Sequence, residues 1–290
     1  MADPLQIVAT QPIPELAVAL LAPLGAVRVA GVEDDAAMAA ADVLVVRTAS
    51  VDETVLARAP RLRAIARTGA GLDTIDLPAA TAAGVPVLYA PDAGVAPIAE
   101  GTIALILAAT KRLGELHGLV ADGRWDERYA YETRDLADTT LGIVGLGRIG
   151  SAVAQLAHGL GMQIVAFEPN DAAPGPEGVP VRRLPLDELF RTADVITLHC
   201  NLDERTRGLV DARLLASTKR GAALVNAGRG ELIADEALLI EALDRGSLSA
   251  VGLDVFAQEP LDPGSPLVRD PRVTCTPHSI GLTRAWNERV

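Results

Sequence analysis

The chain has 290 residues, 49% of them hydrophobic and only 3% aromatic, so it can hold two domains with cores of Ala, Val, Leu and Ile. Its formal net charge of −12 argues against binding to nucleic acids or to anionic membranes, since neither attracts an acidic protein. Cys200 and Cys275 match no metal-ligand spacing, so we predict no metal site. We expect no secretion signal at the N-terminus, and the most apolar helical stretch, Ile103–Ala109, is too short to span a bilayer. We therefore expect a cytoplasmic protein.

The first ninety residues alternate between short β-prone runs and helical stretches rich in Ala and Leu. This alternation predicts a parallel sheet with helices on its faces, in a small α/β domain. The predicted strands are Leu5–Ala9, Val43–Val46, Ala64–Ala66 and Val85–Leu88. Residues Ala90–Pro97 are rich in Pro, Gly and Asp, which is typical of a hinge. A long helix is predicted from Ile98 to about Ala121, and because it begins apolar on nearly all sides we expect it to be buried.

Residues 139–170 carry the pattern around which the rest of the chain is organised. Its parts are, in order, the strand Leu141–Val144, the glycines Gly145, Gly147 and Gly150, a helix with one apolar face, the strand Ile164–Phe167 and the acid Glu168. The acid follows the third glycine by eighteen residues. Strand, Gly-x-Gly-x-x-Gly, helix, strand and acid together form the dinucleotide-binding pattern. A glycine-rich turn in some other α/β protein is the plainer alternative.

Each part of this pattern has a physical role. Gly145 permits a tight turn, Gly147 lets the backbone approach a pyrophosphate, and Gly150 lets helix and strand pack closely. The start of the helix offers free N–H groups and the positive end of its dipole to the phosphates. Glu168 is expected to accept hydrogen bonds from the adenosine ribose hydroxyls. Because no arginine stands in the next two positions to receive a 2′-phosphate, the pattern favours NAD over NADP.

The rest of the chain continues the alternation of strands and helices. The predicted strands are Val195–His199, Ala222–Asn226 and Ala250–Leu253, and the predicted helices lie near Leu186–Arg191, Asp211–Ser217 and Ala234–Arg245. Three stretches combine charged residues with turn residues, each at or near the end of a strand, and these contain Arg229, Glu259 and His278. Since ligands of open α/β sheets bind outside the carboxyl ends of the strands, these three stretches are candidates for the active site.

These three residues supply the groups that hydride transfer at a hydroxyl requires. Histidine exchanges protons near neutral pH, and a carboxylate beside it holds its tautomer and favours the imidazolium. Arginine can grip a substrate carboxylate with two parallel hydrogen bonds. Taken singly, each residue has a plainer interpretation. Arg229 would be a solvated or structural charge, Glu259 would cap a turn, and His278 would be a packed or exposed side chain. Their combination behind a dinucleotide pattern favours an Arg–Glu–His catalytic set.

The chain resembles the D-isomer-specific 2-hydroxyacid dehydrogenases, the family that includes phosphoglycerate dehydrogenase. The matching segments are GLGRIG (Gly145–Gly150), LHC (Leu198–Cys200), NAGRG (Asn226–Gly230), LDVF-x-x-EP (Leu253–Pro260) and PH (Pro277–His278), together with RTGAGLDTIDL (Arg67–Leu77) and AEGTIALIL (Ala99–Leu107). Because they occur in the family's order and spacing, the resemblance covers nearly the whole chain.

The resemblance implies roles for individual residues. Arg229 binds the substrate carboxylate and keto oxygen, His278 is the acid/base, and Glu259 orients and charges it. The implied cofactor residues, besides the glycines and Glu168, are Arg148 and Ile149 at the pyrophosphate, Asp254, Ala227 and Cys200 around the nicotinamide, and Thr102 and Gly281 nearby. The implied substrate residues are Gly69, Ala70, Gly71 and Arg47, the last of these toward a substrate phosphate.

The resemblance also implies an architecture of two doubly wound parallel-sheet α/β domains. A Rossmann-type NAD-binding domain, residues 96–282, is expected within a smaller flavodoxin-like substrate domain formed by residues 1–95 and 283–290. In the family a further helix returns to the first domain after the histidine loop, so the second segment here is expected to be shortened. A homodimer built on the nucleotide domains is implied as well.

The leading hypothesis is therefore an NAD-dependent dehydrogenase that interconverts a D-2-hydroxy acid and its 2-keto acid, with phosphoglycerate, glyoxylate or hydroxypyruvate among the candidate substrates. Hydride is expected to pass to the nicotinamide while His278 takes the hydroxyl proton. The alternative is an NADH-sensing protein, similar to transcriptional co-repressors of this fold, that binds the cofactor without significant turnover. The sequence does not separate the two, because such relatives keep the same three residues.

Overall fold

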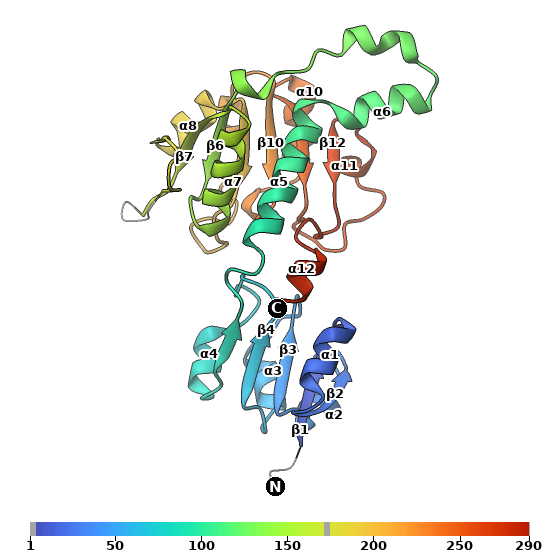
Figure 1. Cartoon of the computed structure of the whole chain (residues 1–290), viewed down its shortest axis with the longest axis vertical. Helices are drawn as coiled ribbons and strands as arrows, with labels where there is room; N and C mark the ends of the chain where they lie inside the picture. Colours follow the sequence, from blue (N-terminus) through green and yellow to red (C-terminus); the bar gives the residue numbers. More distant parts are fainter. Residues whose placement is uncertain (1–3, 171–174, 290) are drawn as a thin grey trace. The chain divides into compact units, whose positions relative to one another are not determined.

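The computed structural model describes residues 4–170 and 175–289 and divides into two compact units (Figure 1). Unit 1 comprises Met1–Gly94 and Leu282–Val290, and unit 2 comprises Val95–Gly281. Unit 2 is thus inserted into the sequence of unit 1, and each unit contains one sheet of its own.

Unit 1 is built on a five-stranded sheet in the order β2-β1-β3-β4-β5, in which every neighbouring pair is parallel. Its strands are β1 (Leu5–Ala9), β2 (Gly25–Val29), β3 (Val43–Val46), β4 (Ala64–Arg67) and β5 (Val87–Tyr89). Its helices are α1 (Glu15–Leu21), α2 (Asp35–Ala40), α3 (Glu53–Arg58), α4 (Leu77–Ala82) and α12 (Arg284–Asn287). This is the flavodoxin-like strand order, whose direction reverses between β1 and β3.

Aspartates fix the starts of three helices of unit 1. The side chains of Asp34, Asp52 and Asp76 each accept a backbone N–H from the first turn of α2, α3 or α4, at 2.9 Å. Such caps satisfy N–H groups that have no partner within the helix. These three helices cover the face of the sheet that holds the larger apolar cluster, around Met38, Leu44 and Ile65.

Unit 2 is built on a seven-stranded parallel sheet in the order β12-β11-β10-β9-β6-β7-β8. Its strands are β6 (Thr140–Val144), β7 (Gln163–Phe167), β8 (Val181–Arg183), β9 (Val195–Leu198), β10 (Ala222–Asn226), β11 (Leu248–Leu253) and β12 (Val273–Cys275). Its α-helices are α5 (Val95–Thr110), α6 (Leu113–Ala121), α7 (Arg148–Gly159), α8 (Leu186–Thr192), α9 (Ala212–Ser217), α10 (Ala237–Arg245) and α11 (Pro266–Arg269); η1 (Trp125–Ala130), η2 (Leu136–Asp138) and η3 (Gly230–Leu232) are 3-10 helices. The sheet has the Rossmann order, extended by one strand, so the predicted fold class is confirmed.

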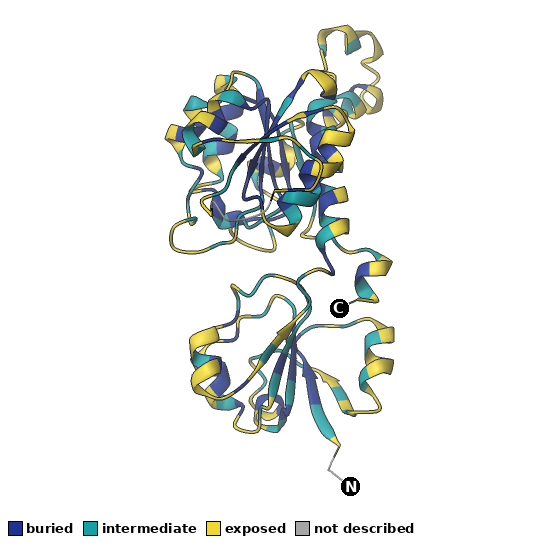
Figure 2. Cartoon of the chain, turned by 60° about the vertical axis from the view of Figure 1, so that its left-hand side comes forward, coloured by how far each residue is buried: buried dark blue, intermediate teal, exposed yellow. Residues whose placement is uncertain are grey.

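The core of unit 2 lies on both faces of its sheet, where buried residues follow the central strands (Figure 2). Strand β9 is buried along its whole length, with Ile196 and Leu198 in one apolar cluster and Val195 in the other. Helices α5 and α7 cover one face, while α8, α9 and α10 cover the other. A parallel sheet buried on both faces explains why the central strands read as continuous apolar runs.

The prediction of one continuous helix from Ile98 to about Ala121 is wrong. The structure has two helices, α5 and α6, and Arg112 between them adopts a left-handed conformation with φ +54°. The Nε and Nη2 atoms of Arg112 each donate to the buried carboxylate of Glu115 at 2.7 Å. No proline marks the break, and an ion pair that stabilises an unusual backbone conformation leaves no sign in the hydrophobic pattern.

Three strands were missed by the sequence pattern, and all three lie at edges of the sheets. These are β2 in unit 1 and β8 and β12 in unit 2. An edge strand pairs on one side only, so its side chains stay partly in solvent and its apolar signal is weak. The strand predicted at Val85–Leu88 begins two residues later, at Val87. Among residues 4–170 and 175–289 no helix is both long and apolar enough to span a membrane.

Candidate active site

The glycines between β6 and α7 meet different steric demands. Gly145 has φ +95°, and a Cβ there would lie 2.5 Å from the backbone nitrogen of Cys200. A Cβ on Gly150 would lie 2.1 Å from the carbonyl oxygen of Gly145, so α7 packs directly on the turn. At Gly147 nothing lies within 4 Å of the place where a Cβ would stand. The turn is therefore tightly packed at both ends and open in the middle.

This opening lies at the N-terminus of α7. Gly147 is the N-cap of the helix and supplies no side-chain cap, and Arg148, the first helical residue, is exposed. The N–H groups of the first turn have no partners within the helix, and the helix dipole adds partial positive charge. An open backbone cradle at such an N-terminus fits a pyrophosphate, as the glycine pattern predicts.

Glu168, at the end of β7, contacts the glycine turn directly. Its Oε2 accepts the backbone N–H of Leu146 at 2.9 Å, and its Oε1 accepts the N–H of Asn170 at 3.0 Å. Each carboxylate oxygen keeps a further lone pair, so Glu168 can still accept hydrogen bonds from ribose hydroxyls. The bond to Leu146 was not predicted, and it gives Glu168 a second role in holding the glycine turn in place.

The loop after β10, which carries Arg229, is held by Asn226. This buried side chain donates from Nδ2 to the carbonyl of Arg229 at 2.8 Å and accepts the N–H of Gly228 at 3.1 Å. The guanidinium of Arg229 itself donates from Nη1 to the carbonyl of Gly228 at 2.8 Å. The sequence pattern assigned no role to Asn226, although an asparagine that ends a buried strand before a glycine loop is a recognisable signal for such a turn.

The Arg229 loop lies against the loop that carries Glu259. A Cβ on Gly230 would stand 1.9 Å from the carbonyl carbon of Phe256, so the two backbones pack together with no room for a side chain. The N–H of Phe256 donates to Oε1 of Glu259 at 3.1 Å. Backbone packing therefore brings Arg229 and Glu259, thirty positions apart in sequence, into the same part of the site.

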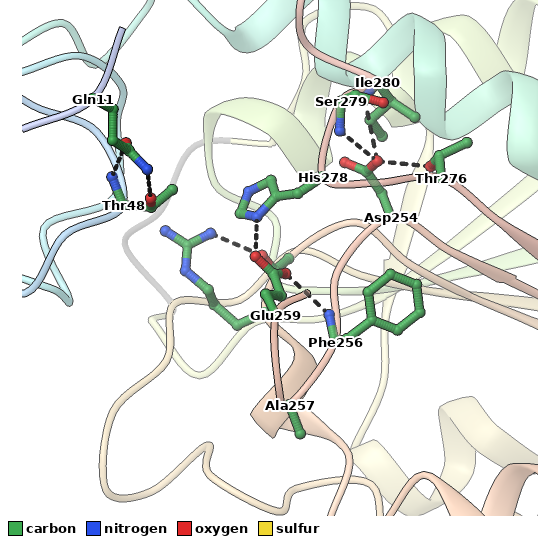
Figure 3. Close-up of polar contacts among 12 residues, drawn as sticks. Gln11, Thr48, Asp254, Phe256, Ala257, Glu259, Thr276, His278, Ser279 and Ile280 are labelled. Carbon is green, nitrogen blue, oxygen red and sulfur yellow. Dashed lines mark hydrogen bonds and ion pairs between the residues drawn. The ribbon is translucent and has the colours of Figure 1, made fainter. Parts of the chain in front are cut away.

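His278 completes this group (Figure 3). Its Nδ1 lies 2.9 Å from Oε2 of Glu259, and the ring and the carboxylate are 42% and 34% exposed. A carboxylate accepts hydrogen bonds only, so Nδ1 carries the proton of this contact and Nε2 is the nitrogen left to face a ligand. The arrangement suits proton exchange with a bound hydroxyl or carbonyl group.

The electrostatics of Glu259 follow from its neighbours. Burial alone raises the pKa of this carboxyl, but the hydrogen bond and charge of His278, the N–H of Phe256 and the charge of Arg229 outweigh burial and lower the pKa below its ordinary value. Glu259 is therefore ionised at neutral pH and supplies a fixed negative charge beside the imidazole.

The backbone around His278 is held by hydrogen bonds to Asp254, which is only 3% exposed. His278 has φ +50°, a left-handed conformation that non-glycine residues rarely adopt. Its N–H donates to the carbonyl of Asp254 at 2.8 Å. The Oδ1 of Asp254 also accepts the hydroxyl of Thr276 and the N–H groups of Ser279 and Ile280 (Figure 3).

Other residues expected near the cofactor lie around the same edge of the sheet. Cys200 follows β9, and burial raises the pKa of its thiol to about 11, so it remains a neutral thiol. Ala227 is half-buried in the Arg229 loop, and Ile149 is half-buried in the first turn of α7. Thr102 is fully buried in α5 and donates its hydroxyl to the carbonyl of Ile98, and a Cβ on Gly281 would lie 2.8 Å from the side chain of that residue.

The remaining expected site residues belong to unit 1. The loop Gly69–Gly71 follows β4, and the side chain of Arg67 donates to the carbonyls of Thr68 and Gly71 at 2.8 and 2.9 Å, which fixes the loop. Arg47 follows β3, is half-buried, and lies over the ring of Trp286 at 5.2 Å. A cavity of about 540 Å³ in unit 1 is lined by Arg47, Arg67 and Trp286, among other residues.

Comparison with known proteins identifies relatives of the chain. Residues 103–279 match the family model described as D-isomer specific 2-hydroxyacid dehydrogenase, NAD binding domain. The chain is 41% identical over 255 residues to D-3-phosphoglycerate dehydrogenase of Mycobacterium tuberculosis, an alignment that covers 88% of this chain and 48% of that protein. It is 35% identical over 248 residues to glyoxylate reductase of Korarchaeum cryptofilum, covering 84% of this chain and 74% of that protein.

A solved structure agrees with these matches. The D-lactate dehydrogenase of Aquifex aeolicus, complexed with NAD and lactic acid, superposes with a TM-score of 0.87 at 27% identity and covers 98% of this chain and 91% of that one. The chain spans about half the length of the phosphoglycerate dehydrogenases that it matches.

Proposed function

Because the chain belongs to the D-isomer specific 2-hydroxyacid dehydrogenase family, we propose that it interconverts a D-2-hydroxy acid and its 2-keto acid with NAD as cofactor. The observation that carries the proposal is the contact at 2.9 Å between His278 and an ionised Glu259, on the same sheet edge as the open cradle at Gly147. When bound, NAD supplies the hydride acceptor for oxidation, and NADH the hydride donor for reduction.

His278, Glu259 and Arg229 have separate roles in the proposed reaction. Nε2 of His278 takes the hydroxyl proton during oxidation and returns it to the carbonyl oxygen during reduction, because Nδ1 is engaged by Glu259. The carboxylate of Glu259 holds the ring and stabilises the imidazolium. Arg229 binds the substrate carboxylate, a task that suits its planar set of N–H donors. The charge of Arg229 also polarises the keto oxygen on which the proton arrives.

The cofactor preference follows from Glu168. Its two oxygens already accept N–H groups from Leu146 and Asn170, and their remaining lone pairs would accept the ribose hydroxyls of a bound NAD. A 2′-phosphate at this point would meet a carboxylate whose position is fixed on both sides, and the repulsion disfavours NADP. We therefore expect NADH to be used far more efficiently than NADPH.

We propose a phosphorylated or otherwise anionic substrate on the strength of Arg47. Among the described residues Arg47 has no carboxylate partner, it packs on Trp286, and it lines the cavity of unit 1. Desolvation lowers the pKa of its guanidinium without neutralising it, so an anion would be an effective partner. The backbone of Gly69–Gly71 supplies N–H groups for the substrate carboxylate. This assignment favours phosphoglycerate over glyoxylate or lactate, the compounds named for other relatives.

We also propose a homodimer formed through unit 2. Helix α6 and η1 form an arm, residues 113–130, that projects from the unit in Figure 1. Its exposed apolar side chains include Val120, Trp125 and Tyr129, and the last two are 61% and 80% exposed. Aromatic residues exposed together on an extended element are typical of an interface, and a second copy of the chain is the partner we expect. Sedimentation should give a dimer that a double Trp125→Ser, Tyr129→Ser variant converts to monomers, whereas a monomeric wild type would contradict this assignment.

The activity is tested by following NADH oxidation with a panel of 2-keto acids: glyoxylate, pyruvate, hydroxypyruvate and phosphohydroxypyruvate. We expect reduction of at least one of them, with phosphohydroxypyruvate preferred, and a loss of about a thousandfold or more in His278→Asn. Arg47→Met should raise KM for the phosphorylated acid much more than for pyruvate. Tight NADH binding with no turnover of any acid, or full activity of His278→Asn, would overturn the proposal.

A further inference from the structure

Thr276 lies two residues before His278 and makes the shortest hydrogen bond to Asp254. Its hydroxyl donates to Oδ1 at 2.6 Å. The same oxygen accepts the N–H of Ser279 at 2.8 Å and that of Ile280 at 3.2 Å (Figure 3). One oxygen of a buried carboxylate thus gathers three donors from the loop that carries the acid/base.

These bonds matter because the loop is strained at His278. A non-glycine residue at φ +50° is stable only where its surroundings impose that conformation. The anchors on either side are the hydroxyl of Thr276 and the N–H of Ser279, both on Oδ1. If they were lost, the loop could relax toward an extended conformation and carry the imidazole away from Glu259.

The second oxygen of Asp254 is used differently. No described residue donates a hydrogen bond to Oδ2, although Asp254 is only 3% exposed. Among the described residues the buried side-chain oxygen that lacks a partner is Oγ1 of Thr74, so Oδ2 of Asp254 is not enclosed and can accept an N–H from a ligand. The two oxygens of the carboxylate therefore have different roles: Oδ1 accepts hydrogen bonds from the His278 loop, and Oδ2 is available to a bound cofactor.

We propose that Thr276 is a positioning residue that keeps Oδ1 of Asp254 bonded to the His278 loop and leaves Oδ2 free for the cofactor. Its hydroxyl holds Oδ1 of Asp254 against the loop and prevents the carboxylate from rotating and exchanging its two oxygens. Thr276 thereby sets both the position of His278 and the availability of Oδ2 to the cofactor. The kinetic part of this inference rests on the proposed function, whereas its structural part does not.

The test compares Thr276→Val, which removes the hydroxyl at nearly constant shape, with Thr276→Ser, which keeps it. Thr110→Val is the matched control, because the hydroxyl of Thr110 donates only to carbonyls of its own helix α5. We expect Thr276→Val to lower kcat about tenfold and to raise the Kd for NADH at least about threefold, with KM for the keto acid little changed. Thr276→Ser and Thr110→Val should remain close to the wild type.

The NADH titration separates positioning from general damage. A variant that merely unfolds a fraction of the molecules lowers kcat but leaves the Kd of the folded molecules for NADH unchanged.

Amide hydrogen exchange provides a readout that needs no turnover. The N–H groups of Ser279 and Ile280 should exchange at least about tenfold faster in Thr276→Val than in the wild type. If the wild type reduced no keto acid, the proposed function would fail while this measurement still decided the role of Thr276. Unchanged exchange together with unchanged NADH affinity in Thr276→Val would overturn the inference.

Discussion

Glu259→Gln isolates the charge of Glu259 from its hydrogen bond. The amide oxygen of glutamine can accept the same Nδ1–H of His278, so the ring keeps its tautomer and orientation. The negative charge is lost, and the imidazolium form loses its counter-charge. We therefore expect slower turnover, with a smaller change in the KM for the keto acid.

The size of the effect follows from the geometry. A hydrogen bond to a charged group contributes about 1.5–3 kcal/mol and a neutral one about 0.5–1.5 kcal/mol, so losing the charge alone costs about 1–1.5 kcal/mol. The two side chains are 42% and 34% exposed, so solvent screens the pair and we take the lower end, about 1 kcal/mol. This corresponds to a fall of about fivefold in kcat.

The assay is kcat for keto-acid reduction between pH 5 and 9. Because the neighbours of Glu259 hold its pKa below the ordinary value, the wild-type carboxylate stays ionised over this range and the loss should persist at every pH. Glu236→Gln is the matched control: Glu236 accepts the N–H of Ala257 in the same loop at 2.7 Å. The reasoning is refuted if Glu259→Gln and Glu236→Gln turn over within twofold of each other.

Further predictions concern the glycine turn and a partly buried histidine. Gly147→Ala should fold like the wild type but bind NADH at least about tenfold more weakly in a fluorescence titration, because its methyl group occupies the open cradle. Gly150→Ala should lower the melting temperature, because its Cβ would collide with the carbonyl of Gly145; equal melting temperatures for the two variants would contradict this. Burial lowers the pKa of His199 to about 4, whereas the unfolded chain titrates near 6.5, so only the unfolded state takes up this proton as the pH falls between these values. Between pH 7 and 4.5 the unfolding free energy of the wild type, measured by urea titration, should therefore fall by about 2.5 kcal/mol more than that of His199→Gln. His158 is exposed, so a difference of similar size between the wild type and the control His158→Gln would count against the assignment.

The positions of the central strands and the glycine turn were predictable because their signals are local. The apolar runs at Leu5–Ala9 and Ala222–Asn226 coincide with β1 and β10, since a strand buried on both faces must be apolar along its length. Edge strands such as Val181–Arg183 were missed because solvent on one side tolerates arginines. The break at Arg112 was missed because it depends on an ion pair with Glu115.

The residues of the candidate catalytic set could be predicted from the sequence, but the hydrogen bonds that position them could not. Arg229, Glu259 and His278 could be named from residue type and motif order, because hydride transfer at a hydroxyl needs a cation, a carboxylate and an imidazole. Arg229 and His278 are held by hydrogen bonds to Asn226 and Asp254. The bonds of Asn226 lie within its own loop, whereas the role of Asp254 does not follow from spacing because it joins loops from different strands.

By itself, then, the amino-acid sequence determined the alternation of strands and helices, the glycine turn and the residue types of the candidate catalytic set. These depend on residue type and on periodicity along the chain, which are local properties. Only the tertiary structure decided that His278 adopts a left-handed backbone over Asp254, with its Nδ1 on Glu259. That outcome depends on contacts between segments far apart in the chain, and on backbone packing as close as that of Gly230 on Phe256, which no local pattern encodes.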